Sequence, residues 1–156
     1  MKKLLFTLLC LFALTGVAQE ISLIPQPAEM KVNEGKFLFR GKVVLCYPKI
    51  KDSGIDAVVD NFVDEMKAAT GIKLKKDRFK NAKLHGFDVI KNNKKGDAHI
   101  VLSVDDSLGD EAYRLSVSAK RIDITAAKPA GFFYAFQTLK QLMPRNVMAG
   151  VPDENV

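Results

Sequence analysis

Four carboxylates lie close together in a short stretch of the chain. They are Asp105, Asp106, Asp110 and Glu111, and the last two are adjacent and follow Gly109. Two neighbouring carboxylates can act as general acid and general base when burial raises one pKa and hydrogen bonds lower the other. Acidic residues are also common in turns, because they are readily solvated there. The stretch lies between two β-like segments, so the residues by themselves favour a turn over a catalytic pair.

Other residues that could carry chemistry are scattered. His85 and His99 lie in different expected strands, without the nearby cysteine or carboxylate spacing of a zinc or iron site. The sequence contains no phosphate-binding glycine loop and no Gly-x-Ser-x-Gly nucleophile motif. Cys46 stands among apolar residues of an expected strand, which favours an inert buried thiol. We therefore expect no metal and no cofactor.

The chain opens with the features of a secretory signal peptide. Two lysines precede an apolar run over residues 4–14, and Gly16 and Ala18 occupy the small-residue positions expected before a cleavage site. The run is shorter than the roughly 20 residues of a membrane-spanning helix. Cleavage after Ala18 would remove 18 of the 156 residues and leave 138, enough for one domain. We expect a secreted or periplasmic protein that is not held in a membrane after cleavage.

The charge balance gives little support to a nucleic-acid partner. The formal net charge is +6, and loss of Lys2 and Lys3 with the signal lowers it to about +4. The densest basic stretch, residues 73–80, contains one aromatic residue, Phe79. A groove for single-stranded nucleic acid interleaves its basic residues with several aromatic ones. We therefore expect no nucleic acid among the partners.

Apolar periodicity predicts a domain that mixes strands and helices. One helix is expected between Ser53 and Gly71, where Ser53 and Asp56 approximate a capping box and the glycine suits a C-cap. Strands are expected at residues 36–39, 42–47, 72–76, 84–90 and 98–104. Strict alternation through residues 112–117 and 121–126, on either side of a short connection, predicts an antiparallel hairpin.

A second helix is expected to close the domain, from Pro129 to Met143. Proline suits a first helical turn, and Pro144 stops the helix. One apolar stripe consists of Phe132, Phe136, Leu139 and Met143. Four further apolar residues widen that stripe: Phe133, Tyr134, Ala135 and Leu142. A helix that covers only one sheet needs a single stripe, so this helix is expected to be covered on two sides.

Two stretches, "IPQPAEMKVNEGKFLF" and "GDEAYRLSVSAKRIDITAAKPAGFFYAFQTLKQLM", carry a resemblance to a known family. The first is similar to the opening "IPxPxxxxxxxGxFxL" of secreted β-N-acetylhexosaminidases of glycoside hydrolase family 20. The second resembles the hairpin and helix that close their N-terminal domain, typically "EgYxLxVxxxxIxIxAxxxaGxFYgxQTLxQLL". The resemblance runs from Ile24 to Met143. In the closing helix the matching residues are Gly131, Phe133, Tyr134, Gln137, Thr138, Leu139, Gln141 and Leu142.

The resemblance implies an α+β domain with a mainly antiparallel sheet and two helices packed on one face. It places a signal peptide at residues 1–18, the domain at 19–144, and a linker at 145–156 that leads toward a catalytic (β/α)8 barrel. In the family this domain packs against the barrel, so the barrel would be the partner that covers the second side of the closing helix. The candidate interface residues are Phe133, Tyr134, Gln137 and Leu142.

The resemblance also implies where catalysis lies. The family's aspartate and glutamate belong to a "HxGGDE" motif on a barrel strand and act in a substrate-assisted mechanism. Asp110 and Glu111 repeat the end of that motif, but Ser107 and Leu108 stand where its leading residues would be. The residues that follow match the N-terminal domain instead. We therefore expect no catalytic residue in this chain, no activity from it alone, and a supporting role in an enzyme that removes terminal N-acetylhexosamine residues.

A second hypothesis is a free-standing secreted module that binds carbohydrate or a cell surface. Such a module needs exposed aromatic rings on which a sugar can stack. The sequence has no tryptophan, and its tyrosines are Tyr47, Tyr113 and Tyr134, each within an expected strand or helix. The aromatic content therefore favours the accessory domain over the binding module.

Overall fold

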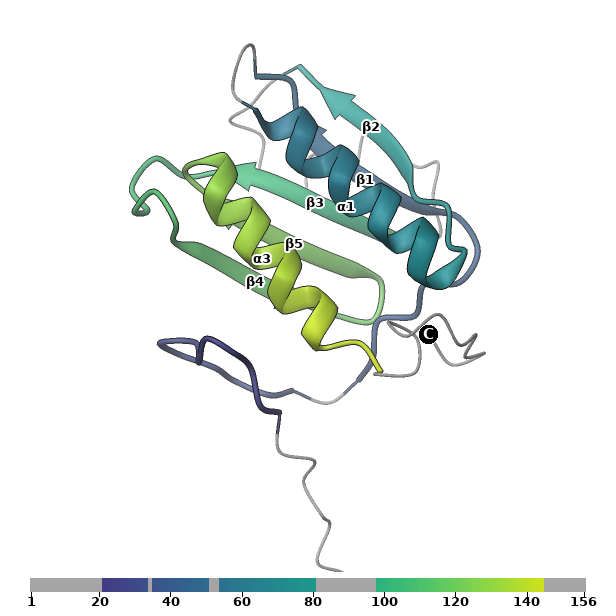
Figure 1. Cartoon of the computed structure of the whole chain (residues 1–156), viewed down its shortest axis with the longest axis horizontal. Helices are drawn as coiled ribbons and strands as arrows, with labels where there is room; N and C mark the ends of the chain where they lie inside the picture. Colours follow the sequence, from purple (N-terminus) through teal and green to yellow (C-terminus); the bar gives the residue numbers. More distant parts are fainter. Residues whose placement is uncertain (1–20, 34, 51–53, 81–97, 145–156) are drawn as a thin grey trace, which may run out of the picture.

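The computed structural model describes residues 21–33, 35–50, 54–80 and 98–144. Figure 1 shows one sheet with both helices on the same side of it. Along the chain the elements are β1 (Val43–Pro48), α1 (Ile55–Thr70), β2 (Lys75–Phe79), β3 (Ala98–Val104), β4 (Tyr113–Val117), β5 (Arg121–Ala126) and α3 (Pro129–Gln141). The expected α+β class and the two helices on one face are confirmed.

The strands form a mixed sheet in the order β2-β1-β3-β5-β4. β1 is parallel to both β2 and β3, and β3 is parallel to β5. Among the described strands, the antiparallel pairing is that of β4 with β5. The expectation of a mainly antiparallel sheet is therefore wrong. The parallel pairings follow from the connections between the strands. α1 returns the chain to the end of the sheet where β1 began, so β2 runs in the same direction as β1. β5 follows β4 in the chain but lies between β3 and β4 in the sheet.

Several expected elements differ in extent. Residues 36–39 form no strand, although Phe37 and Phe39 pack on the core with ring centroids 4.9 Å apart. The strand expected at residues 72–76 begins only at Lys75, and the closing helix ends at Gln141 rather than Met143. α1 has Gly54 as its N-cap, with a φ of 75°. Ser53, the strand expected at 84–90, the signal peptide and residues 145–156 lie outside the described residues.

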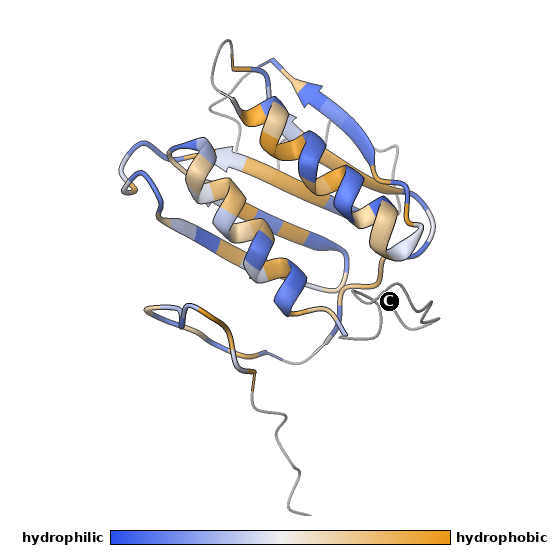
Figure 2. Cartoon of the chain, viewed as in Figure 1, coloured by the Kyte–Doolittle hydropathy of each residue, from blue (hydrophilic) through white to orange (hydrophobic). Residues whose placement is uncertain are grey.

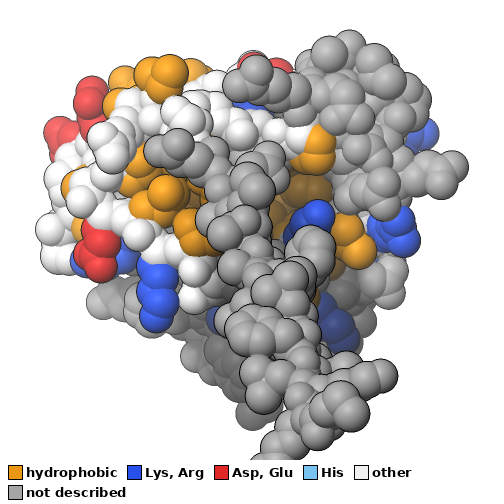
Figure 3. Space-filling model, turned by 90° about the horizontal axis from the view of Figure 1, so that it is seen from below, with side chains coloured by type: hydrophobic (Ala, Val, Ile, Leu, Met, Phe, Trp, Pro, Cys, Tyr) orange, Lys and Arg blue, Asp and Glu red, His pale blue; other side chains and the backbone are white. Residues whose placement is uncertain are grey.

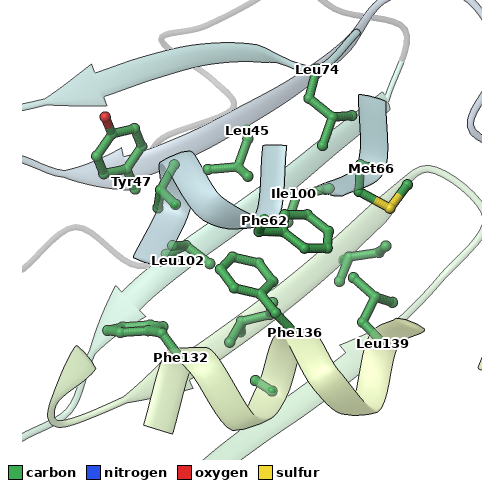
Figure 4. Close-up of a cluster of buried hydrophobic side chains, with 14 of the residues drawn as sticks. Leu45, Tyr47, Phe62, Met66, Leu74, Ile100, Leu102, Phe132, Phe136 and Leu139 are labelled. Atoms are coloured by element: carbon green, nitrogen blue, oxygen red, sulfur yellow. The ribbon is translucent and has the colours of Figure 1, made fainter. Parts of the chain in front are cut away.

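The main core lies between the sheet and the two helices. Phe62 of α1 and Phe136 of α3 stack with centroids 4.0 Å apart and planes 5° from parallel. Figure 4 shows Leu45, Ile100 and Leu102 of the central strands beneath these rings. All five side chains are at most 2% exposed. The aromatic stack therefore joins the two helices to each other as well as to the sheet.

The other face of the sheet is apolar at its centre. Val44, Cys46 and Val101 are at most 1% exposed, and Phe79 packs against them. Cys46 is thus a buried thiol on a strand, as expected, and His99 is a buried residue of β3. His85 lies outside the described residues. Figure 2 shows the contrast between the hydrophobic central strands and hydrophilic β2 at the edge.

Candidate interdomain surface

The four carboxylates lie in the connection from β3 to β4. Asp110 and Glu111 are exposed, and β4 begins two residues after Glu111. The Ala112 N–H donates to the Gly109 carbonyl at 3.0 Å, which closes a turn around the pair. The structure therefore places the two adjacent carboxylates in the polar turn that the sequence favoured.

Asp105 stabilises the start of this connection. Its carboxylate accepts hydrogen bonds from the Ser107 hydroxyl at 2.5 Å, from the Ser107 N–H at 3.0 Å and from Arg114 Nη1 at 2.9 Å. These bonds, with that of the Ser107 hydroxyl foremost, lower the pKa of Asp105 below its usual value. A carboxylate held in its ionised form accepts hydrogen bonds and does not supply a proton. Asp105 therefore orders the loop rather than acting as a general acid.

The inner side of α3 fits closely against the hairpin. A Cβ atom placed on Gly131 would lie 2.5 Å from the Ala112 carbonyl oxygen and 2.8 Å from the Ala126 Cβ, so a side chain has no room there. Further along the helix, the hydroxyls of Thr138 and Tyr113 are 2.6 Å apart and share a hydrogen bond. Gly131 and Thr138 therefore hold α3 in place within the domain.

The outer side of α3 carries three of the four candidate interface residues. Phe133 and Tyr134 are 40% and 39% exposed, and Gln137, one turn further on, is half-buried. The rings of Phe133 and Tyr134 lie edge to face, with centroids 5.6 Å apart. Phe132, the neighbour of Phe133 on the opposite side, is buried in the core. The helix is thus apolar on two sides, and the domain covers one of them.

Leu142, the fourth candidate interface residue, does not lie on the outer side of α3 with Phe133, Tyr134 and Gln137. It is the C-cap residue of α3 and is 37% exposed. Its backbone is still helical, so five residues of helix separate it from Gln137 by about 140° around the axis. The structure therefore brings together Phe133, Tyr134 and Gln137, and it places Leu142 at the end of the helix on a different side.

The outer side of α3 carries little charge, in contrast to α1. Lys140 is the one charged residue of the helix and lies at the edge of this side, where its ammonium is 2.5 Å from Glu65 of α1. The other residues of the outer side are Ala130, Phe133, Tyr134, Gln137 and Gln141. The exposed residues of α1 include Asp56, Asp60, Asp64 and Lys67. Interface cores are depleted in charge, whereas water-facing helices carry it, so the outer side of α3 is a candidate for contact with a partner.

One contact that the sequence analysis missed joins the first described residues to the end of α3. The Ile24 N–H donates to Gln141 Oε1 at 2.9 Å, and Gln141 Nε2 donates to the Ile24 carbonyl at 2.8 Å. Ile24 is 79% exposed, whereas the preceding Leu23 is buried. A separation of 117 residues hides this pair from any local pattern. The helical spacing of Gln141 from Phe133, Tyr134 and Gln137 indicates its side of α3 but not its partner.

The described residues show neither a metal centre nor a membrane span. Within them, no group of three or more His, Cys, Asp or Glu side chains could hold a metal ion. No helix in the described ranges has both the length and the apolar character needed to cross a bilayer. The feature that stands out in this part of the chain is the exposed aromatic pair on the outer face of α3.

Fold and surface together define a small α+β domain whose closing helix has exposed aromatic residues on its outer side. The sequence profile of glycosyl hydrolase family 20, domain 2, matches residues 20–155. The chain belongs to this family. A comparison with curated proteins gives no match.

Solved structures with the same fold are family 20 enzymes. An exo-β-N-acetylglucosaminidase from Vibrio harveyi is 23% identical, with a TM-score of 0.59, and the match covers 79% of this chain and 16% of that one. The β-N-acetylhexosaminidase of Streptomyces coelicolor is 28% identical, with a TM-score of 0.54 and coverages of 80% and 22%. The Flavobacterium johnsoniae chitobiase is 29% identical, with a TM-score of 0.51, and the match covers 79% of this chain and 18% of that one. The match thus takes up about a fifth of each enzyme.

Proposed function

We propose that this chain is a non-catalytic accessory domain of a β-N-acetylhexosaminidase, and that it supports a catalytic (β/α)8 barrel. The observation that carries the proposal is the outer face of α3, where Phe133 and Tyr134 are exposed and the one charged residue, Lys140, is paired with Glu65, in a domain that matches only 16–22% of enzymes from its own family. Such a face needs a cover, and in a family 20 enzyme the remaining length of chain can supply one. Phe133 and Tyr134 are the residues that would be buried against it.

The enzyme served by this domain would remove terminal N-acetylhexosamine residues. The supporting observation is that the similar structures are named as β-N-acetylglucosaminidases or β-N-acetylhexosaminidases. The proposal includes export to the periplasm or the exterior after cleavage near Ala18, with the domain at residues 19–144 and a linker after it. The charged first residues and the apolar run that follows support export.

Binding to a catalytic portion tests the proposal. This chain is mixed with the part of the Streptomyces coelicolor enzyme that remains when the matched region is removed. We expect a complex that Phe133→Ser weakens about tenfold or more, because a large aromatic contact is lost from a desolvated interface. Asp64→Ser on α1 is the control and should leave the affinity unchanged. Titration calorimetry measures both. Absence of a complex, or equal effects of the two variants, would contradict the proposed role.

Activity of the chain alone provides the complementary check. Assayed with a chromogenic N-acetyl-β-glucosaminide, the isolated chain should give the rate of the uncatalysed reaction. Asp110 and Glu111 are exposed in the turn that precedes β4. Turnover that disappears in Glu111→Gln would instead identify the pair as catalytic and overturn the accessory role.

The alternative of a free-standing binding module rests on the exposed aromatic pair of α3. Phe133 and Tyr134 are about two-fifths exposed, but their rings stand at 70° to each other and do not form one flat platform. Binding to a glycan array that is lost in Tyr134→Ala would favour this module. Binding to the catalytic portion without glycan binding would favour the accessory domain.

A further inference from the structure

The segment at Ile24 lies beside the end of α3 and is held there by one side chain. Gln141 uses its carbonyl oxygen and its amide nitrogen together, accepting from the Ile24 N–H and donating to the Ile24 carbonyl. The two bonds, of 2.9 and 2.8 Å, pair the side-chain amide with the backbone as a neighbouring strand would. Pro25 and Pro27 have no N–H groups, so this segment is a poor partner for a real strand.

The pairing leaves the Ile24 side chain directed away from the domain. Ile24 is 79% exposed, although both of its backbone polar groups are bound and Leu23 beside it is buried. A large apolar side chain on a fixed backbone loses little conformational freedom when a partner covers it. Free apolar residues of flexible termini do not have this property. The geometry is that of an anchor arranged in advance.

The position of this anchor makes it continuous with the outer face of α3. Gln141 is the last residue of α3 and follows the strip of Phe133, Tyr134 and Gln137 at helical spacing. Leu142, next in the chain, is also exposed. Figure 1 shows the N-terminal segment passing below α3, and Figure 3, which views the molecule from that side, shows hydrophobic side chains gathered there.

We propose that Gln141 is a positioning residue that holds Ile24 in the surface contacted by the catalytic barrel, so that the interface is built from the first segment of the domain as well as from its last helix. This inference rests on the proposed function. The barrel is the favoured occupant because α3 ends at this surface, and the match with this domain leaves most of the length of a family 20 enzyme to other parts of that chain. The chain that follows α3 therefore begins beside Ile24.

Hydrogen exchange on this chain tests the positioning. In the wild type the Ile24 amide should exchange slowly, and in Gln141→Ala at least about tenfold faster, because the amide loses its acceptor. Gln141→Glu keeps an acceptor oxygen and should restore much of the protection. Gln26→Ala removes the same side-chain amide from an exposed glutamine of the same segment and serves as the control. Equal exchange at Ile24 in the wild type and Gln141→Ala would overturn the positioning role.

Binding to the same catalytic portion of the Streptomyces coelicolor enzyme tests the interface. We expect Ile24→Ser to weaken the complex about tenfold and Gln141→Ala about three- to tenfold, with melting temperatures unchanged, since both residues are exposed. Gln26→Ala should bind as the wild type does. If Phe133→Ser weakens binding but Ile24→Ser does not, this inference fails and the proposed function stands. If the wild type forms no complex, both fail.

Discussion

At the scale of single residues, the side chains of this domain divide by what they contact. Asp105 accepts three hydrogen bonds within its own loop, Gly131 makes room for a neighbouring carbonyl, and Thr138 bonds to Tyr113 across the domain. The contacts of these three residues lie within the domain and stabilise its fold. Phe133 and Tyr134 are different, because each is about two-fifths exposed, whereas Phe132 and Phe136 of the same helix are buried.

Tyr47 provides a prediction at this scale. Burial raises its pKa from 10.0 to about 12, and the hydrogen bond that its hydroxyl donates to Asp56 Oδ1 at 3.0 Å adds to the shift. A folded-state pKa above the unfolded value means that the protonated hydroxyl stabilises the fold. That stabilisation is complete below pH 10 and is lost as the pH rises toward 12.

Tyr47→Phe should therefore be less stable than the wild type at pH 8, by about 1 kcal/mol for the lost hydrogen bond. The difference should narrow as the pH rises above 10, since only the wild type loses the contribution of this hydroxyl. Urea unfolding at a series of pH values measures the gap. A gap that stays constant up to pH 12 would show that the Tyr47 hydroxyl has the same acidity in the folded and unfolded chain.

At the scale of elements, local patterns were predicted well and long-range pairings were not. The alternation of residues 112–117 and 121–126 identified the β4–β5 hairpin, because both strands and their turn lie within fifteen residues. β1 and β3 are near-continuous apolar runs, which is typical of parallel strands buried on both faces, but their sequences do not say which strands pair. Residues 36–39 show the converse, since their apolar pattern comes from Phe37 and Phe39 packing on the core without a strand partner.

The same division applies to the candidate surface. Phe133 and Tyr134 were identified as candidates because helical spacing shows which residues face the core, and these two apolar residues lie outside that stripe. Leu142 was grouped with them, but its backbone is still helical and places it about 140° around the axis from Gln137. Gln141 and Ile24 could not be paired from the sequence, because two hydrogen bonds across 117 residues depend on the complete fold.

Gly131→Ala tests the packing of α3 on the hairpin. Alanine favours a helix over glycine by about 1 kcal/mol, so a neutral environment would make the variant more stable. Contacts of 2.5 Å to the Ala112 carbonyl oxygen and 2.8 Å to the Ala126 Cβ oppose this gain. We expect a net destabilisation of about 1–3 kcal/mol in denaturant unfolding.

Gly109→Ala is the matched control for that substitution. Its added Cβ would meet the Ala112 Cβ at 3.8 Å, which is an ordinary contact. The control should therefore change the stability by less than about 0.5 kcal/mol. A melting temperature of Gly131→Ala at or above that of the wild type would show that α3 does not pack this closely against Ala112, the residue before β4.

At the scale of the whole molecule, the two helices differ in the surface that they turn away from the sheet. The sheet and two helices bury a continuous core that includes the Phe62–Phe136 stack. Charged residues cover the outer side of α1, and salt bridges join its Asp56 and Asp60 to β2. The outer side of α3 instead exposes the rings of Phe133 and Tyr134, so the isolated chain is expected to fold and yet to associate through this side.

Two serine substitutions in α3 separate folding from association. Phe136→Ser removes a ring that is 2% exposed and should cost about 3–5 kcal/mol, enough to unfold much of a small domain. Phe133→Ser removes a ring that is 40% exposed, so it should leave the melting temperature nearly unchanged and raise the soluble concentration. Circular dichroism and light scattering measure the two effects. Equal loss of structure in both variants would mean that α3 has no free side.

The position of β5 also bears on how the domain is synthesised. A growing chain leaves the ribosome from its N-terminus, yet β5 lies between β3 and β4, which both precede it. Until residues 121–126 emerge, β3 has an open edge and β4 has no partner in the sheet. Phe62 of α1 likewise has no ring to stack on until Phe136 of α3 has been synthesised. Nascent chains shorter than about 140 residues should therefore remain incompletely folded, and a chaperone that binds open edges would act on them in this interval.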